Sequence, residues 1–251
     1  MTHRIRVIAF LAAAAVAAVL LLRGLGGMPE FGAGHSPYRQ YLNEHAVAET
    51  HATDLPSAVN FSYRALDTLG EEYILFASVA GVAVLLREPH RGKKPAKKAR
   101  VPDDCCPEEA VVAVSRAVVT VVIVFGFYVT IHAHLTPGGG FQGGAILGTG
   151  ILLIYLADGH EAFAQAIHPS LVHALEAAGA AGYVSLGLAA MLGGKAFLEN
   201  ILPLGETGQF FSAGIVPLIS LAVGLEVSGG FSSLFVDFIS ELHRSSEESE
   251  P

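Results

Sequence analysis

Six apolar segments constrain this chain more than any other feature of its sequence. A helix rises about 1.5 Å per residue, so about 20 apolar residues cross the ~30 Å hydrocarbon core of a bilayer. With 52% hydrophobic and 15% charged residues, the chain is too apolar for an ordinary soluble protein. We therefore predict an all-α, polytopic protein with about six transmembrane helices in the cell membrane. The segments are residues 5–22, 59–87, 110–131, 142–157, 171–192 and 208–239.

The first apolar segment, residues 5–22, follows a basic start that contains Arg4 and Arg6. A cleaved signal peptide has the same pattern. No small-residue cleavage site stands out after Leu22, and Arg23 follows at once. We therefore expect this segment to be retained as a membrane anchor.

The glycine-rich break HAHLTPGGGFQGGAILGTG, residues 132–150, separates two apolar segments and predicts tight helix packing. Proline lacks a backbone donor and glycine has no preferred φ, so the chain turns here. Glycines at 140, 144 and 148 recur four residues apart and give one smooth helix face on which another helix could lie. His132 and His134 lie on different faces, which favours interface histidines over a metal pair. The predicted packing motif is Pro137, Gly138, Gly139, Gly140, Phe141, Gln142, Gly143, Gly144 and Gly148.

Four carboxylates within or beside apolar segments are the candidates for an ion pathway: Glu226, Glu176, Asp67 and Glu71. An acidic residue near the centre of a membrane helix costs about 2.5–3.5 kcal/mol, so it usually faces the bundle interior. Glu226 is the deepest of the four and could carry protons, or it could fix one helix against another. Glu176 lies nearer a helix start and favours a structural role. Asp67 and Glu71 share a helix face, where an acidic helix start is the alternative explanation.

The charged residues divide the chain into four predicted parts. Residues 1–88 form a two-helix membrane segment, and residues 89–109 form a basic linker that holds Cys105 and Cys106 as free thiols. Short basic loops beside membrane helices mark the cytoplasmic side, which we prefer here to a nucleic-acid-binding tail. Residues 110–240 form a four-helix membrane domain, and the acidic residues 241–251 predict a disordered tail.

A family resemblance is carried by the glycine-rich break and by two later stretches, HPSLVHALEAAGAAGYVSLGLAAMLGG and FLENILPLGETGQFFSAGIVPLISLAVGLEV. Over residues 110–240 the chain resembles the B subunit of Mrp-type multisubunit Na+/H+ antiporters. DTLGE at residues 67–71, after Tyr63 and Arg64, resembles the C-terminal portion of the A subunit of these antiporters. The same stretch is similar to the small E subunit of membrane-bound hydrogenases.

This resemblance implies a membrane subunit of a monovalent cation (Na+)/proton antiporter. Its partners would be the other Mrp-type subunits and the lipid membrane, and the transported ions would be Na+ and H+. The sequence carries no phosphate loop, nucleophile elbow or dinucleotide fingerprint, so we predict no enzyme activity, no cofactor, no metal site and no nucleic-acid partner. Two alternatives stay open: a purely structural linker, and an antiporter-like module of a membrane-bound hydrogenase or related redox complex.

Overall fold

The computed structural model of the protein describes residues 3–28, 36–86 and 109–248. The chain divides into two units, residues 1–41 and 42–251, and each is described by itself. The predicted basic linker, with Cys105 and Cys106, lies outside the described residues except for residue 109.

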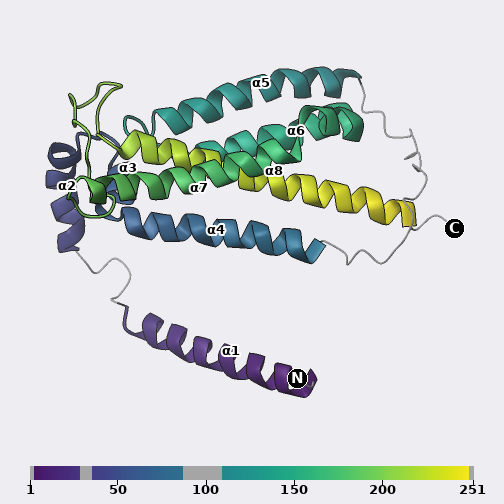
Figure 1. Ribbon diagram of the computed structural model, residues 1–251, viewed down its shortest axis with the longest axis horizontal. Coiled ribbons are helices and arrows are strands. Elements are labelled where there is room, and N and C mark those ends of the chain that lie inside the picture. Colours follow the sequence, from purple (N-terminus) through teal and green to yellow (C-terminus); the bar gives the residue numbers. More distant parts are fainter. Residues whose placement is uncertain (1–2, 29–35, 87–108, 249–251) are drawn as a thin grey trace. The chain divides into compact units, whose positions relative to one another are not determined.

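Every regular element in the described part of the chain is helical, which confirms the predicted fold class. Six helices are long and apolar enough to cross a membrane, as predicted: α1, α4, α5, α6, α7 and α8. The elements are α1 (His3–Gly26), α2 (Pro37–Thr50), α3 (Leu55–Ala58), the π-helical turn η1 (Val59–Tyr63), α4 (Ala65–Leu86), α5 (Glu109–Ile131), α6 (Gly140–Ala166), α7 (Pro169–Leu192) and α8 (Val216–Glu248) (Figure 1).

Helix α1 belongs to the first unit and is apolar on all sides. None of its membrane-length stretch, Val7–Gly26, is buried within the protein. A helix without a polar face needs apolar surroundings on every side, as lipid provides. This helix is therefore suited to anchor the chain in a bilayer.

Helix α8 is the centre of the second unit, because α4, α5, α6 and α7 all contact it (Figure 1). In its most apolar stretch 67% of the residues are buried, against 11% in α4 and in α5. Residues that face other helices rather than lipid are those that can carry polar side chains cheaply. Helix α8 holds several of them, including buried Ser220, Glu226, Ser232 and Ser233.

The ends of α8 differ from the prediction. The helix begins at Val216 rather than near residue 208, so Pro217 is its second residue and starts the helix instead of kinking it. At the other end α8 continues to Glu248, where the acidic composition predicts disorder from residue 241. Charged residues such as Glu and Arg extend a formed helix at little cost, because only nucleation is expensive.

Two further segments are more helical than predicted. Residues 1–88, predicted to hold two membrane helices, also contain α2, α3 and η1. Helix α6 runs to Ala166, beyond the expected end at residue 157, and its regular geometry is interrupted at Gly159, which has φ 76°. Glycine accepts this conformation without the steric cost that other residues have.

The glycine face of α6 lies directly against α8. A Cβ atom at Gly144 would lie 2.8 Å from the carbonyl oxygen of Gly224, and one at Gly148 would lie 2.7 Å from Cβ of Phe231. At Gly140 the nearest atom would be the carbonyl oxygen of Ser220, at 2.1 Å. These distances leave no room for a side chain, so the backbones of α6 and α8 touch.

The second unit is closed at one end by residues 51–64, 132–139 and 193–215, which we call the loop end. His134 joins these three segments. Its Nε2 donates to the carbonyl oxygen of Phe210 at 3.0 Å, and its own carbonyl oxygen accepts from the backbone N–H of Thr53 at 2.9 Å. The His134 ring is buried, and its Nδ1 has no hydrogen-bond partner among the described residues.

The first prediction concerns the α6–α8 contact. Replacing Gly144 and Gly148 by Leu should overpack it, at a cost of about 1–3 kcal/mol per site. Thermal unfolding and the yield of assembled protein in mild detergent would measure this loss. Gly81→Leu is a matched control, since a Cβ there meets nothing within 4 Å. Equal stability of the double variant and the control would contradict the contact.

The second prediction concerns pH. Burial lowers the pKa of His134 below the usual value of about 6.5, because the charged ring loses its hydration. The unfolded chain therefore binds this proton at higher pH than the folded protein does. The stability contributed by the neutral ring is complete above about pH 6.5 and is lost as the pH falls below it. The unfolding temperature should therefore be lower near pH 5.5 than near pH 7.5.

The variant His134→Gln keeps a donor for the Phe210 carbonyl but does not titrate. Its unfolding temperature should depend less on pH than that of the wild type. His168→Gln, which changes an exposed histidine at the start of α7, is the control and should leave the pH dependence as it is. An unaltered pH dependence in His134→Gln would rule out His134 as its source.

Candidate functional site

Three carboxylates from three different helices are buried inside the second unit. Glu72 of α4 is 2% exposed, Glu226 of α8 is 1% exposed and Glu176 of α7 is 6% exposed. We call these three residues the carboxylate row. Each belongs to a helix that is otherwise apolar enough to cross the membrane.

The row extends along the bundle rather than lying at one depth. At about 1.5 Å per residue, Glu72 is about 10 Å from the start of α4 and Glu226 about 15 Å from the start of α8, both measured from the loop end. Glu176 is about 10 Å from the start of α7, which runs the other way. The order from the loop end inward is therefore Glu72, Glu226 and Glu176.

The crossing of α7 and α8 places two of these glutamates reciprocally. Each helix carries a glutamate followed three residues later by a glycine: Glu176 and Gly179 on α7, and Glu226 and Gly229 on α8. A Cβ at Gly179 would lie 2.4 Å from the backbone nitrogen of Glu226, and one at Gly229 would lie 2.5 Å from that of Glu176. Because the helices are antiparallel, each glutamate backbone rests on the glycine of the other helix.

Electrostatic coupling links the members of the row. When ionised, Glu226 repels Glu72, and Glu176 repels Glu226, because all three carry the same negative charge. No lysine or arginine in the described part of the chain forms an ion pair with any of the three. Without a lysine or arginine beside them, the three carboxyls have no permanent cation to offset the cost of a buried charge.

Two oxygen atoms in the row lack a hydrogen-bond partner among the described residues: Oε2 of Glu72 and Oε1 of Glu226. Buried polar atoms are nearly always satisfied, and the exceptions in native proteins occur at places with a function or with bound water. Glu72 and Glu226, the two most buried members of the row, can therefore each form a further hydrogen bond.

Toward the loop end, apolar residues precede Glu226 on α8. Ile219 and Val223 precede Glu226 on α8 and are almost completely buried together with Tyr183 of α7. The hydroxyl of Tyr183 donates to the carbonyl oxygen of Ala65, at the start of α4, at 2.7 Å. This donor is occupied by the backbone. On α4, one turn nearer the loop end than Glu72, the buried Thr68 donates its hydroxyl to the carbonyl oxygen of Asn60 at 2.8 Å.

At the opposite end the row meets polar groups. Nδ1 of His173 lies 3.8 Å from Oε2 of Glu176 and 3.5 Å from Oγ of Ser233. An ionised Asp237 also repels Glu176. The Oδ2 atom of Asp237 is buried and has no hydrogen-bond partner among the described residues. The His173 side chain is 54% exposed, whereas that of Glu176 is only 8% exposed.

The four carboxylates proposed from the sequence fall into two groups. Glu226 and Glu176 lie in the row. Asp67 and Glu71 share the exposed side of α4, where Asp67 pairs with Nε of Arg64 at 2.6 Å. Sequence reasoning missed Glu72, although a helical pattern could have identified it: the buried residues of α4 are Ala65, Thr68, Glu72 and Val79.

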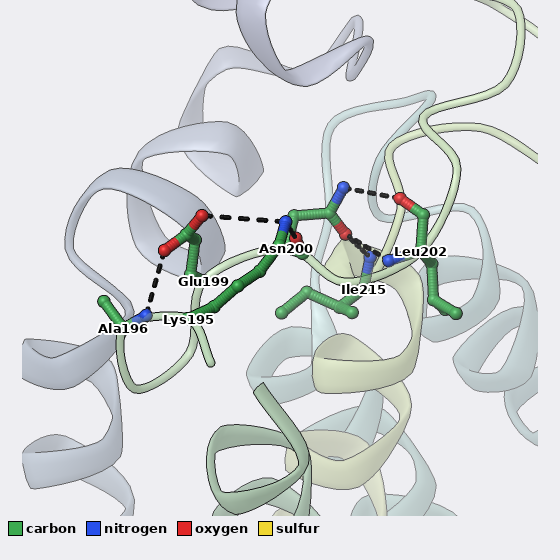
Figure 2. A network of polar contacts seen from close by, with 6 residues as sticks. All are labelled: Lys195, Ala196, Glu199, Asn200, Leu202 and Ile215. Carbon is green, nitrogen blue, oxygen red and sulfur yellow. Dashed lines mark hydrogen bonds and ion pairs between the residues drawn. The ribbon is translucent and has the colours of Figure 1, made fainter. Parts of the chain in front are cut away.

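The loop end contains a second polar arrangement, shown in Figure 2. Asn200 accepts from the backbone N–H of Ile215 at 3.0 Å and donates to the carbonyl oxygen of Leu202 at 2.7 Å, which fixes the chain just before α8. Lys195 pairs with Glu199 at 3.6 Å. A cavity of about 260 Å³ lies beside this network, and buried Phe61 and Ile215 form part of its lining.

No three His, Cys, Asp or Glu side chains in the described part of the chain are grouped so that they could hold a metal ion. The three carboxyls of the row thus lie one after another along the bundle and do not form one shared set of metal ligands.

Residues 110–233 match the family described as "Domain related to MnhB subunit of Na+/H+ antiporter". A Methanocaldococcus jannaschii protein, "Uncharacterized protein MJ1307", is 30% identical over 192 residues, which are 70% of this chain and 73% of that protein. A Staphylococcus aureus protein, "Putative antiporter subunit mnhB2", is 35% identical over 132 residues, 47% of this chain and 93% of that protein.

Two solved structures share the fold. A chain of the membrane-bound sulfane sulfur reductase, an archaeal respiratory membrane complex, is 33% identical with a TM-score of 0.66, and the match covers 93% of this chain and 97% of that one. A chain of the Mrp complex from Dietzia sp. DQ12-45-1b is 24% identical, with a TM-score of 0.68. The match covers 100% of this chain and 27% of that one and shows likeness of fold. The chain is a multi-pass membrane protein that belongs to the MnhB family of antiporter subunits.

Proposed function

We propose that this subunit carries protons along its carboxylate row within a multisubunit monovalent cation/proton antiporter. The observation that supports this most is the pair of buried, partnerless oxygens on Glu72 and Glu226, on helices that otherwise face lipid or each other. Such carboxyls can bind and release a proton without a change in covalent structure. The proposed function is therefore transport, with no enzymatic reaction and no cofactor.

Partner subunits are part of this proposal. The relatives are described as an antiporter subunit and as chains of multisubunit complexes. Most of the surface of α4 and α5 is not covered by other parts of this chain. On α4 the exposed side includes the acidic Glu71, which is costly to leave against lipid. We propose that other subunits cover part of this surface and that Na+ crosses the membrane elsewhere in the assembly.

A second candidate is the membrane module of a redox-driven complex. The match to the sulfane sulfur reductase chain covers nearly the whole of both chains, including the region before the MnhB match. Purification of the native complex in mild detergent would decide between the two assemblies. Antiporter subunits alone would support the first candidate, and hydrogenase-like or reductase subunits would support the second.

The third prediction tests the row itself. Glu226→Gln keeps the shape and hydrogen-bonding capacity of the side chain but cannot titrate. If Glu226 relays protons, sodium-dependent proton exchange by the assembled complex in membrane vesicles should fall by about 10²-fold or more. Glu199→Gln, which changes an exposed loop carboxylate, should keep normal exchange.

A purely structural Glu226 gives a different result. Glu226→Gln would then retain exchange, whereas Glu226→Ala would reduce the amount of assembled complex, because it leaves a gap at the α7–α8 crossing. Normal exchange by fully assembled Glu226→Gln would therefore disprove the relay.

The fourth prediction concerns Glu72, which sequence reasoning missed. Because Glu72 is nearly as buried as Glu226 and lies near enough to be repelled by it, Glu72→Gln should impair exchange to a similar degree. The double variant should be no slower than either single variant, since both changes interrupt one series. A Glu72→Gln complex with normal exchange and normal assembly would remove Glu72 from the row.

A further inference from the structure

We propose that His173 is the residue through which the carboxylate row exchanges protons with the aqueous phase at the end opposite the loop end. This inference rests on the proposed proton transport and adds the place of entry. It is based on the position of His173 between an exposed surface and a buried carboxyl.

Exposure changes sharply between His173 and Glu176. The two side chains are 54% and 8% exposed although they are three residues apart on α7. His173 is about 6 Å, or one helical turn, from the start of α7. An imidazole at this depth can meet solution protons on one side and the row on the other.

The distances suit a transfer that needs a small movement. Nδ1 of His173 is 3.8 Å from Oε2 of Glu176, too far for a direct hydrogen bond but close enough for one bridging water or a slight ring rotation. Oγ of Ser233, at 3.5 Å from Nδ1, borders the same gap from α8. Of the side chains, imidazole is the one that commonly exchanges protons near neutral pH.

The transfer balances without another reactant. A solution proton binds Nε2 of a ring that is protonated at Nδ1, and the resulting imidazolium passes its Nδ1 proton to the ionised Glu176 carboxylate. The neutral ring that remains carries its proton on Nε2 and returns to the starting tautomer by exchange with solvent. The net result is one proton moved from solution to Glu176, from which Glu226 is the next carboxyl.

Further polar groups surround Glu176 at the end of the row where His173 lies. Ser233 and the buried Oδ2 of Asp237 continue the polar groups beyond Glu176. His173 is the exposed member of this polar group.

The test uses the intact complex reconstituted in liposomes, with a pH-sensitive dye to follow exchange. His173→Gln should lower the exchange rate about tenfold or more, because a positioned proton carrier is lost. Added imidazole should restore most of the rate, since the gap left by the exposed ring is open to solution. His168→Gln is the matched control: this exposed histidine at the start of α7 should be dispensable.

Three outcomes would overturn the proposal. These are normal exchange by assembled His173→Gln, a loss that imidazole does not relieve, and failure of both His173→Gln and His173→Asn to assemble. Failure of the proposed function is distinguishable from these, because it would appear as normal exchange in Glu226→Gln. Imidazole should not restore exchange in Glu226→Gln, whose site lies deep in the bundle.

Discussion

The antiparallel contact between α7 and α8 is the interaction on which the rest of the structure depends. Glycines on both helices allow the backbones to touch, and each glycine receives the backbone of a glutamate from the other helix. An acidic residue that faces lipid costs free energy. Close packing of α7 against α8 removes both glutamates from lipid. The same geometry sets the spacing of Glu176 and Glu226, so packing and the proposed transport share one cause.

The sequence predicted the number and type of helices well, because membrane helices are defined by long apolar runs that need no knowledge of neighbours. Glu176 and Glu226 were recognised for the same reason, as acids within such runs. Glu72 was missed because Glu71 stands beside it, and only the packing of α4 against α8 decides which of two adjacent carboxyls is buried. The helical start at Pro217 and the helices of residues 37–63 also depend on tertiary contacts rather than on local composition.

The two kinds of relative are compatible with one physical description of the chain. The match to the antiporter family covers residues 110–233, whereas the match to the reductase chain also includes most of the earlier region. Glu72 comes from that earlier region and the other two row members from the later one. The row is thus completed where α4 packs against the helices of the family domain.

The central position of α8 also has a consequence for the making of this protein. Among the bundle helices, α8 is the last in the chain, yet α4, α5, α6 and α7 all pack on it. During synthesis the earlier helices enter the membrane while the glycine face of α6 and the acid of α7 still lack their neighbour. Final packing must therefore wait for α8, and until it arrives the half-made bundle is a target for the membrane's insertion chaperones and proteases.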